Sequence, residues 1–219
     1  MEWLIVPDPT QGQTARVISI LRSPAARKIA FTLGAWRINA LAFENIASAI
    51  ALGDIEVVVA PPKGGAEAAY NFKRDFIMVP DATYGAKVTQ QAAIIHECVH
   101  AFVDMKQIAG QAESANEAAA YLAGMLYILH TGIDIPPTNH PIGILAGGIA
   151  KKMVGQPGAA VPSTFESDLR RTISSHPRYK DQGMTFDSPD TSNGLWRVRA
   201  LRGRTDIDMV KLPPKTQLA

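Results

Sequence analysis

The sequence contains very little cysteine: Cys98 is the only one in 219 residues. A single cysteine excludes a disulfide within the chain, which is consistent with a reducing compartment. Cys98 lies between two histidines, and we expect it to be a small buried hydrophobic residue rather than a ligand or a redox group.

Long apolar runs and a strong charge of one sign are also missing. No apolar run reaches the roughly 18 residues of a membrane-spanning helix, so no membrane span is expected. The first residues lack the charged-then-apolar layout of a secretory signal, which predicts a cytoplasmic location, with export by a route that needs no such signal left open. The net charge is only +2, which gives no strong signal for nucleic-acid binding.

One short motif dominates what is present: His96-Glu97-Cys98-Val99-His100, an H-E-x-x-H pattern. Two histidines four residues apart lie one turn apart on the same face of a helix, so both imidazoles can bind one Zn²⁺ ion. Glu97 points about 100° away from His96 around the helix, where it misses the metal but can reach a metal-bound water. This pattern predicts a zinc site in which His96 and His100 are ligands and Glu97 is the general base.

The residues around the motif predict a buried helix over 88–107. This helix is apolar on nearly all sides, so its three central polar residues need metal or hydrogen-bond partners. A second, Ala-rich helix follows over 112–130, and its small side chains allow a close approach to the motif helix.

The remaining pattern predicts a mainly helical α+β domain over residues 1–185, with its core at about 36–130. Helices are expected from Ser23-Pro24, over 36–52 and 141–154, and after Ser163, where Glu166 would form a capping box. A strand at 55–60 and one bent strand or two strand pieces over 70–79 would form a small sheet, antiparallel because the connections are short. Residues 186–219 are expected to form an irregular basic appendage that can contact a protein partner, with Arg197, Arg199, Arg202 and Arg204 as its basic residues.

A catalytic zinc ion usually has three protein ligands, so a third must come from outside the motif. The metzincin pattern requires Gly at 103 and His at 106, and Val103 and Lys106 exclude it. Glu113 and Glu117 both qualify, and Asp104 is a further alternative. We favour Glu117 because three alanines follow it, so its helix can approach the motif helix closely there, whereas Glu113 complements the helix dipole.

Together, His96-Glu97-x-x-His100 and Glu117-Ala118-x-x-Tyr121-x-Ala123 resemble the gluzincin zinc metallopeptidases. The compact layout is similar to minimal bacterial and phage members, including ImmA/IrrE-type peptidases and polymorphic-toxin peptidase domains. The resemblance covers about residues 40–130. It implies His96, His100 and Glu117 as zinc ligands, Glu97 as catalytic base, and a protein or peptide substrate. Some gluzincins carry an aspartate four residues after the ligand glutamate, where this chain has Tyr121.

These observations predict zinc-dependent peptide hydrolysis, with two other readings open. One is a zinc-stabilised, non-catalytic domain, in which a fourth protein ligand would close the site. The other is a toxin-type or effector-type interaction module that uses the basic appendage. The group that stabilises the oxyanion stays open among five candidates: Tyr70, Tyr84, Tyr121, His176 and Tyr179.

Overall fold

The computed structural model describes residues 9–62, 66–107, 111–181, 183–189 and 194–195. The helices are α1 (Pro9–Leu21), α2 (Pro24–Lys28), α3 (Ala40–Leu52), α4 (Val88–Lys106), α5 (Glu113–His130), α6 (Pro141–Met153), α7 (Ser163–Ser175) and α8 (Pro177–Lys180). The strands are β1 (Phe31–Leu33), β2 (Trp36–Ile38), β3 (Glu56–Val59), β4 (Ala69–Asn71) and β5 (Phe76–Val79). The chain is therefore mainly helical, with two small sheets, as the α+β prediction stated.

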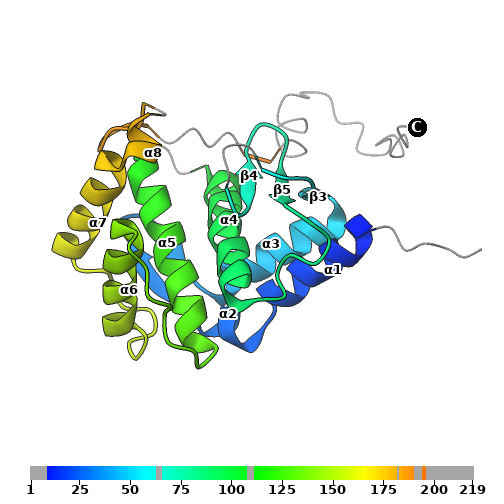
Figure 1. Cartoon of the computed structure of the whole chain (residues 1–219), viewed down its shortest axis with the longest axis horizontal. Helices are drawn as coiled ribbons and strands as arrows, with labels where there is room; N and C mark the ends of the chain where they lie inside the picture. Colours follow the sequence, from blue (N-terminus) through cyan, green and yellow to red (C-terminus); the bar gives the residue numbers. More distant parts are fainter. Residues whose placement is uncertain (1–8, 63–65, 108–110, 182, 190–193, 196–219) are drawn as a thin grey trace, which may run out of the picture.

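Two long helices, α4 and α5, form the centre of the molecule (Figure 1). On one side α5 packs against α6 and α7, and on the other side α4 packs against α3 and α1. The motif helix is buried as predicted: Ile94, Ile95, Cys98 and Val99 are fully inaccessible to solvent. Its polar centre is therefore held in a rigid apolar frame.

Small side chains bring α4 and α5 close together. Ala118, Ala119 and Ala120 are fully buried on α5. One turn further along, a Cβ placed on Gly124 would lie 3.1 Å from the carbonyl oxygen of Ala92 on α4. A side chain at 124 would therefore crowd the backbone of α4, and the predicted close approach of the two helices is confirmed.

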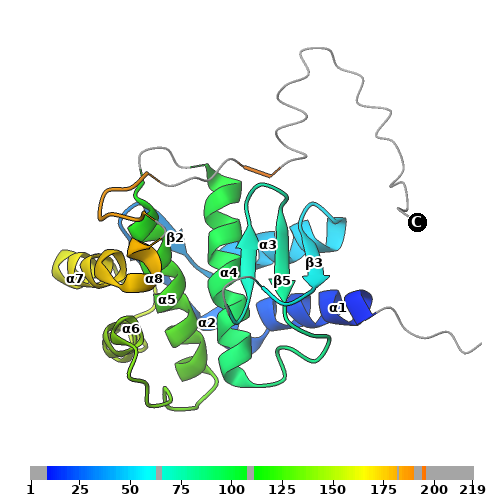
Figure 2. The same cartoon turned by 45° about the horizontal axis from the view of Figure 1, so that its top comes forward.

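The three-stranded sheet lies beside α4 and has the strand order β3-β5-β4 (Figure 2). β4 and β5 form an antiparallel hairpin, which confirms the expectation of two strand pieces over 70–79. The expectation of an antiparallel sheet is wrong for β3, which pairs with β5 in parallel. The reason is the strand order: the chain leaves β3 and forms β4 on the far side of β5, so β3 and β5 are not joined by a hairpin.

The predicted helix over 36–52 begins later than expected. Residues 36–38 form β2, which pairs antiparallel with β1, and Trp36 and Ile38 are buried while Arg37 between them is exposed. The turn between the two strands contains Gly34 at φ +55°. α3 begins after Asn39, whose side chain accepts hydrogen bonds from two backbone N–H groups of the first turn. The alternation of apolar, polar and apolar residues at 36–38 is typical of a strand, although the longer segment around it favoured a helix.

The predicted capping box at Ser163 and Glu166 is also absent. Ser163 is the first residue of α7, and it follows Pro162 at the N-cap. The Glu166 carboxylate accepts a hydrogen bond from the Gly34 N–H at 3.2 Å and pairs with Arg170 at 3.6 Å. A tertiary contact with the β1–β2 turn has therefore replaced the local cap.

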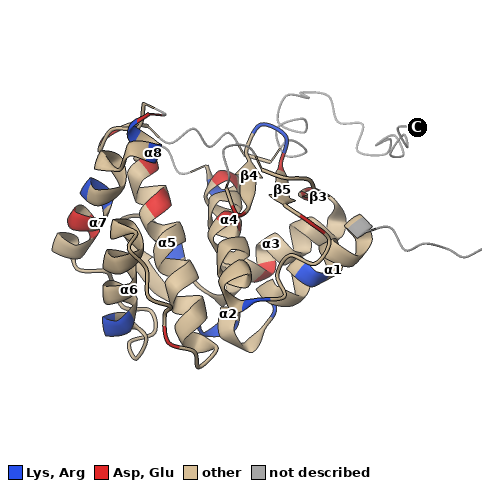
Figure 3. Ribbon diagram, in the orientation of Figure 1, with Lys and Arg blue, Asp and Glu red and all other residues tan. Residues whose placement is uncertain are grey.

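The first residues of the predicted appendage contact the helical domain. The Glu113 N–H at the start of α5 donates to the Ser188 carbonyl at 2.8 Å, and Leu195 is buried. The four predicted appendage arginines lie outside the described residues. Within the described residues, Lys and Arg are scattered over the helices (Figure 3), and none of these helices combines the length and apolarity that crossing a bilayer requires.

Candidate metal centre

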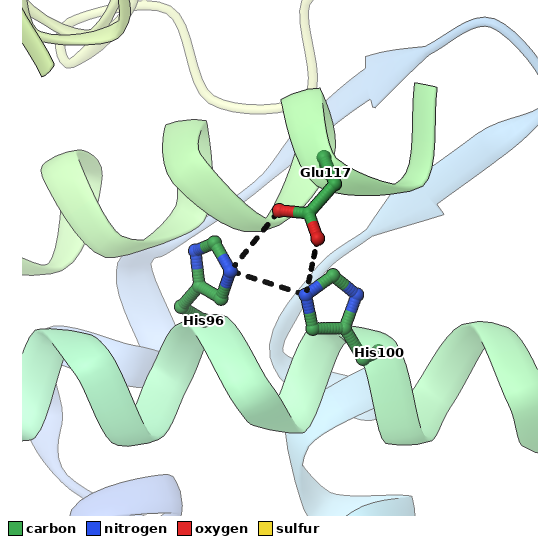
Figure 4. A group of neighbouring side chains, drawn as sticks. All are labelled: His96, His100 and Glu117. Carbon is green, nitrogen blue, oxygen red and sulfur yellow. Dashed lines mark hydrogen bonds and ion pairs between the residues drawn. The ribbon is translucent and has the colours of Figure 1, made fainter. Parts of the chain in front are cut away.

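The two motif histidines point from α4 toward α5 (Figure 4). Their Nε2 atoms lie 3.1 Å apart, and each side chain is 16% exposed. Two ring nitrogens at this separation repel unless a proton or a cation lies between them. The i, i+4 spacing on one helix thus gives the convergence that the sequence predicted.

Glu117 completes the group from α5. Its Oε2 lies 3.4 Å from the Nε2 of His96, and its Oε1 lies 3.6 Å from the Nε2 of His100. A tetrahedral site with zinc–ligand bonds of about 2.0–2.1 Å has edges of roughly 3.3 Å between ligand atoms. The three observed separations are close to that edge, so the donor atoms are spaced to hold one metal ion.

The other two candidate ligands lie elsewhere. Asp104 is buried and accepts hydrogen bonds at 2.8 Å from the Tyr70 hydroxyl and from the Gly194 N–H. Glu113 is the first residue of α5, one turn before Glu117. Within the described part of the chain, the metal-binding group contains His96, His100 and Glu117 and excludes Asp104, Glu113 and Cys98. Cys98 is fully buried, and burial raises the pKa of its thiol, as expected for an apolar packing residue.

Asn116 orients His100. This role of Asn116 was not predicted from the sequence. The Asn116 Oδ1 lies 2.9 Å from the Nδ1 of His100. A carbonyl oxygen accepts, so the His100 Nδ1 carries the proton and the lone pair of Nε2 faces the group. The only sequence signal was the position of Asn116 directly before Glu117, and no spacing rule marks it.

Glu97 lies beside the group rather than in it. Its Oε2 accepts a hydrogen bond at 2.7 Å from the backbone N–H of Tyr70 in β4. Its Oε1 is 4.0 Å from the Nε2 of His96, and the side chain is 14% exposed. One carboxylate oxygen is therefore anchored by the sheet, and the other is next to the candidate metal position.

Two tyrosines also contact the group. The Tyr179 hydroxyl in α8 donates to Glu117 Oε2 at 3.0 Å and is 2.9 Å from the Tyr121 hydroxyl in α5. The Tyr121 ring packs edge-on against His96, with ring centroids 4.7 Å apart. At the position where some gluzincins carry an aspartate, this chain thus has an aromatic residue that contacts the imidazole of His96.

The other three candidate donors for an oxyanion are Tyr70, Tyr84 and His176. The Tyr70 hydroxyl bonds to Asp104, and the Tyr84 side chain is buried. His176 accepts a hydrogen bond from the Arg178 N–H at 3.3 Å and packs against His140. Among the five candidates, the Tyr179 hydroxyl contacts the group directly, and the Tyr121 hydroxyl is linked to it through Tyr179.

The surroundings of Glu117 and Tyr179 set the protonation states of these two side chains. Burial alone would raise the pKa of Glu117, but the charges of His100 and His96 and the hydrogen bonds from His96 and Tyr179 lower it to about 2. Burial and the negative charge of Glu117 raise the pKa of Tyr179. Glu117 is therefore an anion at neutral pH, and Tyr179 keeps its proton and can donate it in a hydrogen bond.

The site opens into a cavity of about 560 Å³ that is lined mainly by α4, α5, α8, the linker between α5 and α6 and the residues before β4. His96, Glu97, His100 and Glu117 all line this cavity, as do Tyr121 and Tyr179. A molecule that enters the cavity can therefore reach both the metal-binding group and Glu97.

Comparison of the chain with protein-family models, curated proteins and solved structures found no match. The similarity to gluzincins consequently rests on the motif residues and on the group that they form in the fold.

Proposed function

We propose that this protein is a zinc-dependent peptidase in which His96, His100 and Glu117 hold the metal and Glu97 is the general base. The observation that carries this proposal is the spacing of the three donor atoms, 3.1 to 3.6 Å apart, next to a carboxylate in an open cavity. Two imidazole nitrogens and one carboxylate oxygen form a donor set that suits Zn²⁺ and is common at catalytic zinc sites. Within the described residues the group has three members, which favours a catalytic site over a structural one closed by a fourth protein ligand.

When bound, zinc would lower the pKa of a water molecule and polarise the carbonyl group of the scissile bond. Glu97 would accept a proton from the attacking water and return it to the leaving nitrogen as the carbon–nitrogen bond breaks. The Tyr70 backbone N–H holds one Glu97 oxygen, so the carboxylate keeps its direction during this transfer. The hydroxyls of Tyr121 and Tyr179 are the donors available to stabilise the negative charge that develops on the carbonyl oxygen.

The position of β4 supports a peptide as the substrate. β4 is an edge strand, and Glu67 and Ala68, directly before it, line the cavity. The Tyr70 N–H in β4 bonds to Glu97, so β4 lies directly beside the proposed general base. An extended peptide can add to such an edge through backbone hydrogen bonds, which would place its main chain beside the metal.

The proposal is tested by metal analysis and by a cleavage assay on the same preparations. The wild-type protein should contain about one zinc per chain and should cleave a mixture of denatured proteins. Glu97→Gln should keep the zinc and the fold but lose roughly 10²–10⁴-fold in rate. Glu113→Gln is the matched control, because the same change is made outside the metal-binding group, and its rate should stay near wild type.

Two results would contradict the proposal. The first is a zinc-loaded wild-type protein that cleaves no peptide bond, which would favour the zinc-stabilised, non-catalytic domain. The second is a Glu97→Gln variant that cleaves at the wild-type rate, which would remove Glu97 from the mechanism.

A further inference from the structure

The charged residues that line the cavity are divided between its two sides. Glu67, two residues before β4, and Glu97, which β4 holds through the Tyr70 N–H, lie toward the three-stranded sheet. Arg178 of α8 lies on the other side, because β4 is beside α4 and α8 is beside α5 (Figure 1 and Figure 2). Among the described residues that line the cavity, Arg178 is the only lysine or arginine. The α8 side is therefore the positive side of the cavity.

The charge of Arg178 is available to a ligand. Its side chain is exposed, and within the described residues no carboxylate forms an ion pair with it, whereas Arg171 on α7 pairs with Asp168 at 3.2 Å. The Arg178 Cζ lies 5.8 Å from the centre of the Tyr179 ring, which lines the same cavity. A guanidinium stays charged at all working pH values, and its planar set of N–H donors matches the two oxygens of a carboxylate.

His140 adds a second donor on this side. Its ring lines the cavity and packs against the ring of His176, with centroids 4.6 Å apart. The hydrogen bonds that His140 makes with described residues use its main-chain N–H and carbonyl groups, so both ring nitrogens can face a ligand. A neutral imidazole has one N–H donor and an imidazolium has two. His140 can therefore donate to an anion that Arg178 attracts.

The pKa values near α8 show that its positive charge acts on the cavity. Burial and the positive charges of His176 and Arg178 lower the pKa of His140. Burial raises the pKa of Tyr121 and of Tyr179, and the positive charge of Arg178 partly offsets both rises. The field of Arg178 thus reaches three residues that line the cavity, and an anion bound among them would be stabilised.

Ring contacts connect this positive side to the metal-binding group. The centre of the Tyr121 ring lies 4.7 Å from that of His96 and 6.4 Å from that of His140. An extended peptide advances about 3.3–3.6 Å per residue. A carboxylate up to about three residues from a bond held at the metal can therefore reach His140 and Arg178.

We infer that Arg178 and His140 form an anion subsite that binds a carboxylate of the substrate within about three residues of the cleaved bond. This inference rests on the proposed peptidase function, and it adds the class of substrate. A peptide that adds to the edge of β4 would run over the metal-binding group toward α8, so the carboxylate would lie on the side of the cut that is away from β4. It is supplied either by an aspartate or glutamate side chain or by the C-terminus of the peptide.

The first test compares the cleavage of matched peptides. Glutamate is exchanged for glutamine at each of the three positions on either side of the cut, and a free C-terminus is exchanged for an amide. One of these carboxylates should raise kcat/KM by about tenfold or more over its neutral analogue, because hydrogen bonds between charged groups are the stronger ones. A gain from glutamate identifies an acidic side chain as the ligand, and a gain from the free C-terminus identifies the chain end. Equal rates within every pair would overturn the inference and leave the peptidase proposal intact.

A second measurement uses binding instead of turnover. Hydroxamates that carry a carboxylate or a carboxamide at a spacing of one, two or three residues, extended from either their carbonyl or their nitrogen, are titrated into the zinc-loaded protein by calorimetry. In one of these pairs the carboxylate should bind about tenfold more tightly. This comparison decides the inference even where the protein cleaves no peptide bond, and equal affinities in all pairs would overturn it.

Variants locate the preference. Arg178→Gln removes the charge and keeps hydrogen-bonding atoms, so the ratio of acidic to neutral kcat/KM should fall from about tenfold to nearly one. Arg171→Gln, the same change at an exposed position outside the cavity, is the control and should keep the ratio. His140→Phe keeps a ring and loses both nitrogens, so it should lower the ratio by about threefold. A ratio that stays at the wild-type value in both Arg178→Gln and His140→Phe would exclude the subsite as the origin of the preference.

Discussion

The helices α4 and α5 contribute to the same group of donor atoms in different ways. α4 supplies two candidate ligands whose separation is set by helix geometry alone, because His96 and His100 are one turn apart in one rigid element. α5 supplies one candidate ligand, Glu117, and the place of that carboxylate depends on how closely the two helices pack. The first contribution is local and the second is tertiary, so variants of the two helices should differ in how strongly they affect metal binding.

The largest effect on zinc binding is expected from the two histidines of α4. His96→Ala or His100→Ala removes one of two ligands that a single helix holds in place, so zinc binding should be lost. The measurement is the zinc content of the purified protein by mass spectrometry. His130→Ala, at the end of α5 and outside the group, is the control and should retain about one zinc per chain. Full zinc occupancy in both motif variants would refute the metal site.

The next effect concerns the tertiary ligand. Glu117→Ala should lower zinc affinity by more than the roughly 10–100-fold that loss of a ligand's hydrogen-bond partner costs. Glu113→Ala leaves the group intact and should cost only about 1 kcal/mol or less of stability through the helix dipole. Competition with a chromophoric chelator measures both affinities, and thermal unfolding measures the stability. Equal zinc affinities for the two variants would show that Glu117 is not a ligand.

A smaller effect is expected from Asn116, which acts on His100 without being a ligand. Asn116→Ala removes the acceptor for the Nδ1 proton, so zinc affinity should fall by about 10–100-fold. Asn116→Asp keeps an acceptor oxygen and should retain an affinity near that of the wild type. A general loss of stability would affect the two variants alike, so equal affinities for both would argue against an orienting role.

The smallest effect tests the packing that places Glu117. Gly124→Ala puts a Cβ 3.1 Å from the Ala92 carbonyl oxygen, whereas Gly148→Ala adds a Cβ in open space on α6. Alanine favours helices over glycine by about 1 kcal/mol, so Gly148→Ala should raise the free energy of unfolding by up to that amount. Gly124→Ala should lower it by about 1 kcal/mol, because crowding of a packed interior outweighs the gain in helix propensity. Chemical denaturation checks both values, and equal stabilisation by the two substitutions would mean that α4 and α5 are not held at this contact.

The same division between local and tertiary information explains what the sequence could predict. The motif helix, the α5 helix and the i, i+4 histidines follow from spacing and composition within one segment. Glu117 was predictable because the alanines after it indicated where a neighbouring helix could approach. The alanines next to Glu117 in the sequence therefore predicted a contact between two helices, and this contact favoured Glu117 over Glu113.

What the sequence did not predict depends on contacts between distant segments. The parallel pairing of β3 with β5 follows from the strand order, which no residue in either strand specifies. Asn116 became recognisable only when α5 was placed beside His100. Likewise, Glu166 had a plausible local partner, but the turn at Gly34, distant in sequence, provided the partner that the fold uses.

The hydrogen bond between Glu97 and the Tyr70 N–H has a consequence for how the site tolerates sequence change. The donor is a main-chain group, so nineteen of the twenty amino acids at position 70 would supply it, and proline alone would not. The side chain at position 70 can therefore change, with loss of its contact to Asp104, while the main-chain N–H still holds the Glu97 carboxylate. Among related sequences, we therefore expect the residue type at position 70 to vary while the strand that carries it is kept.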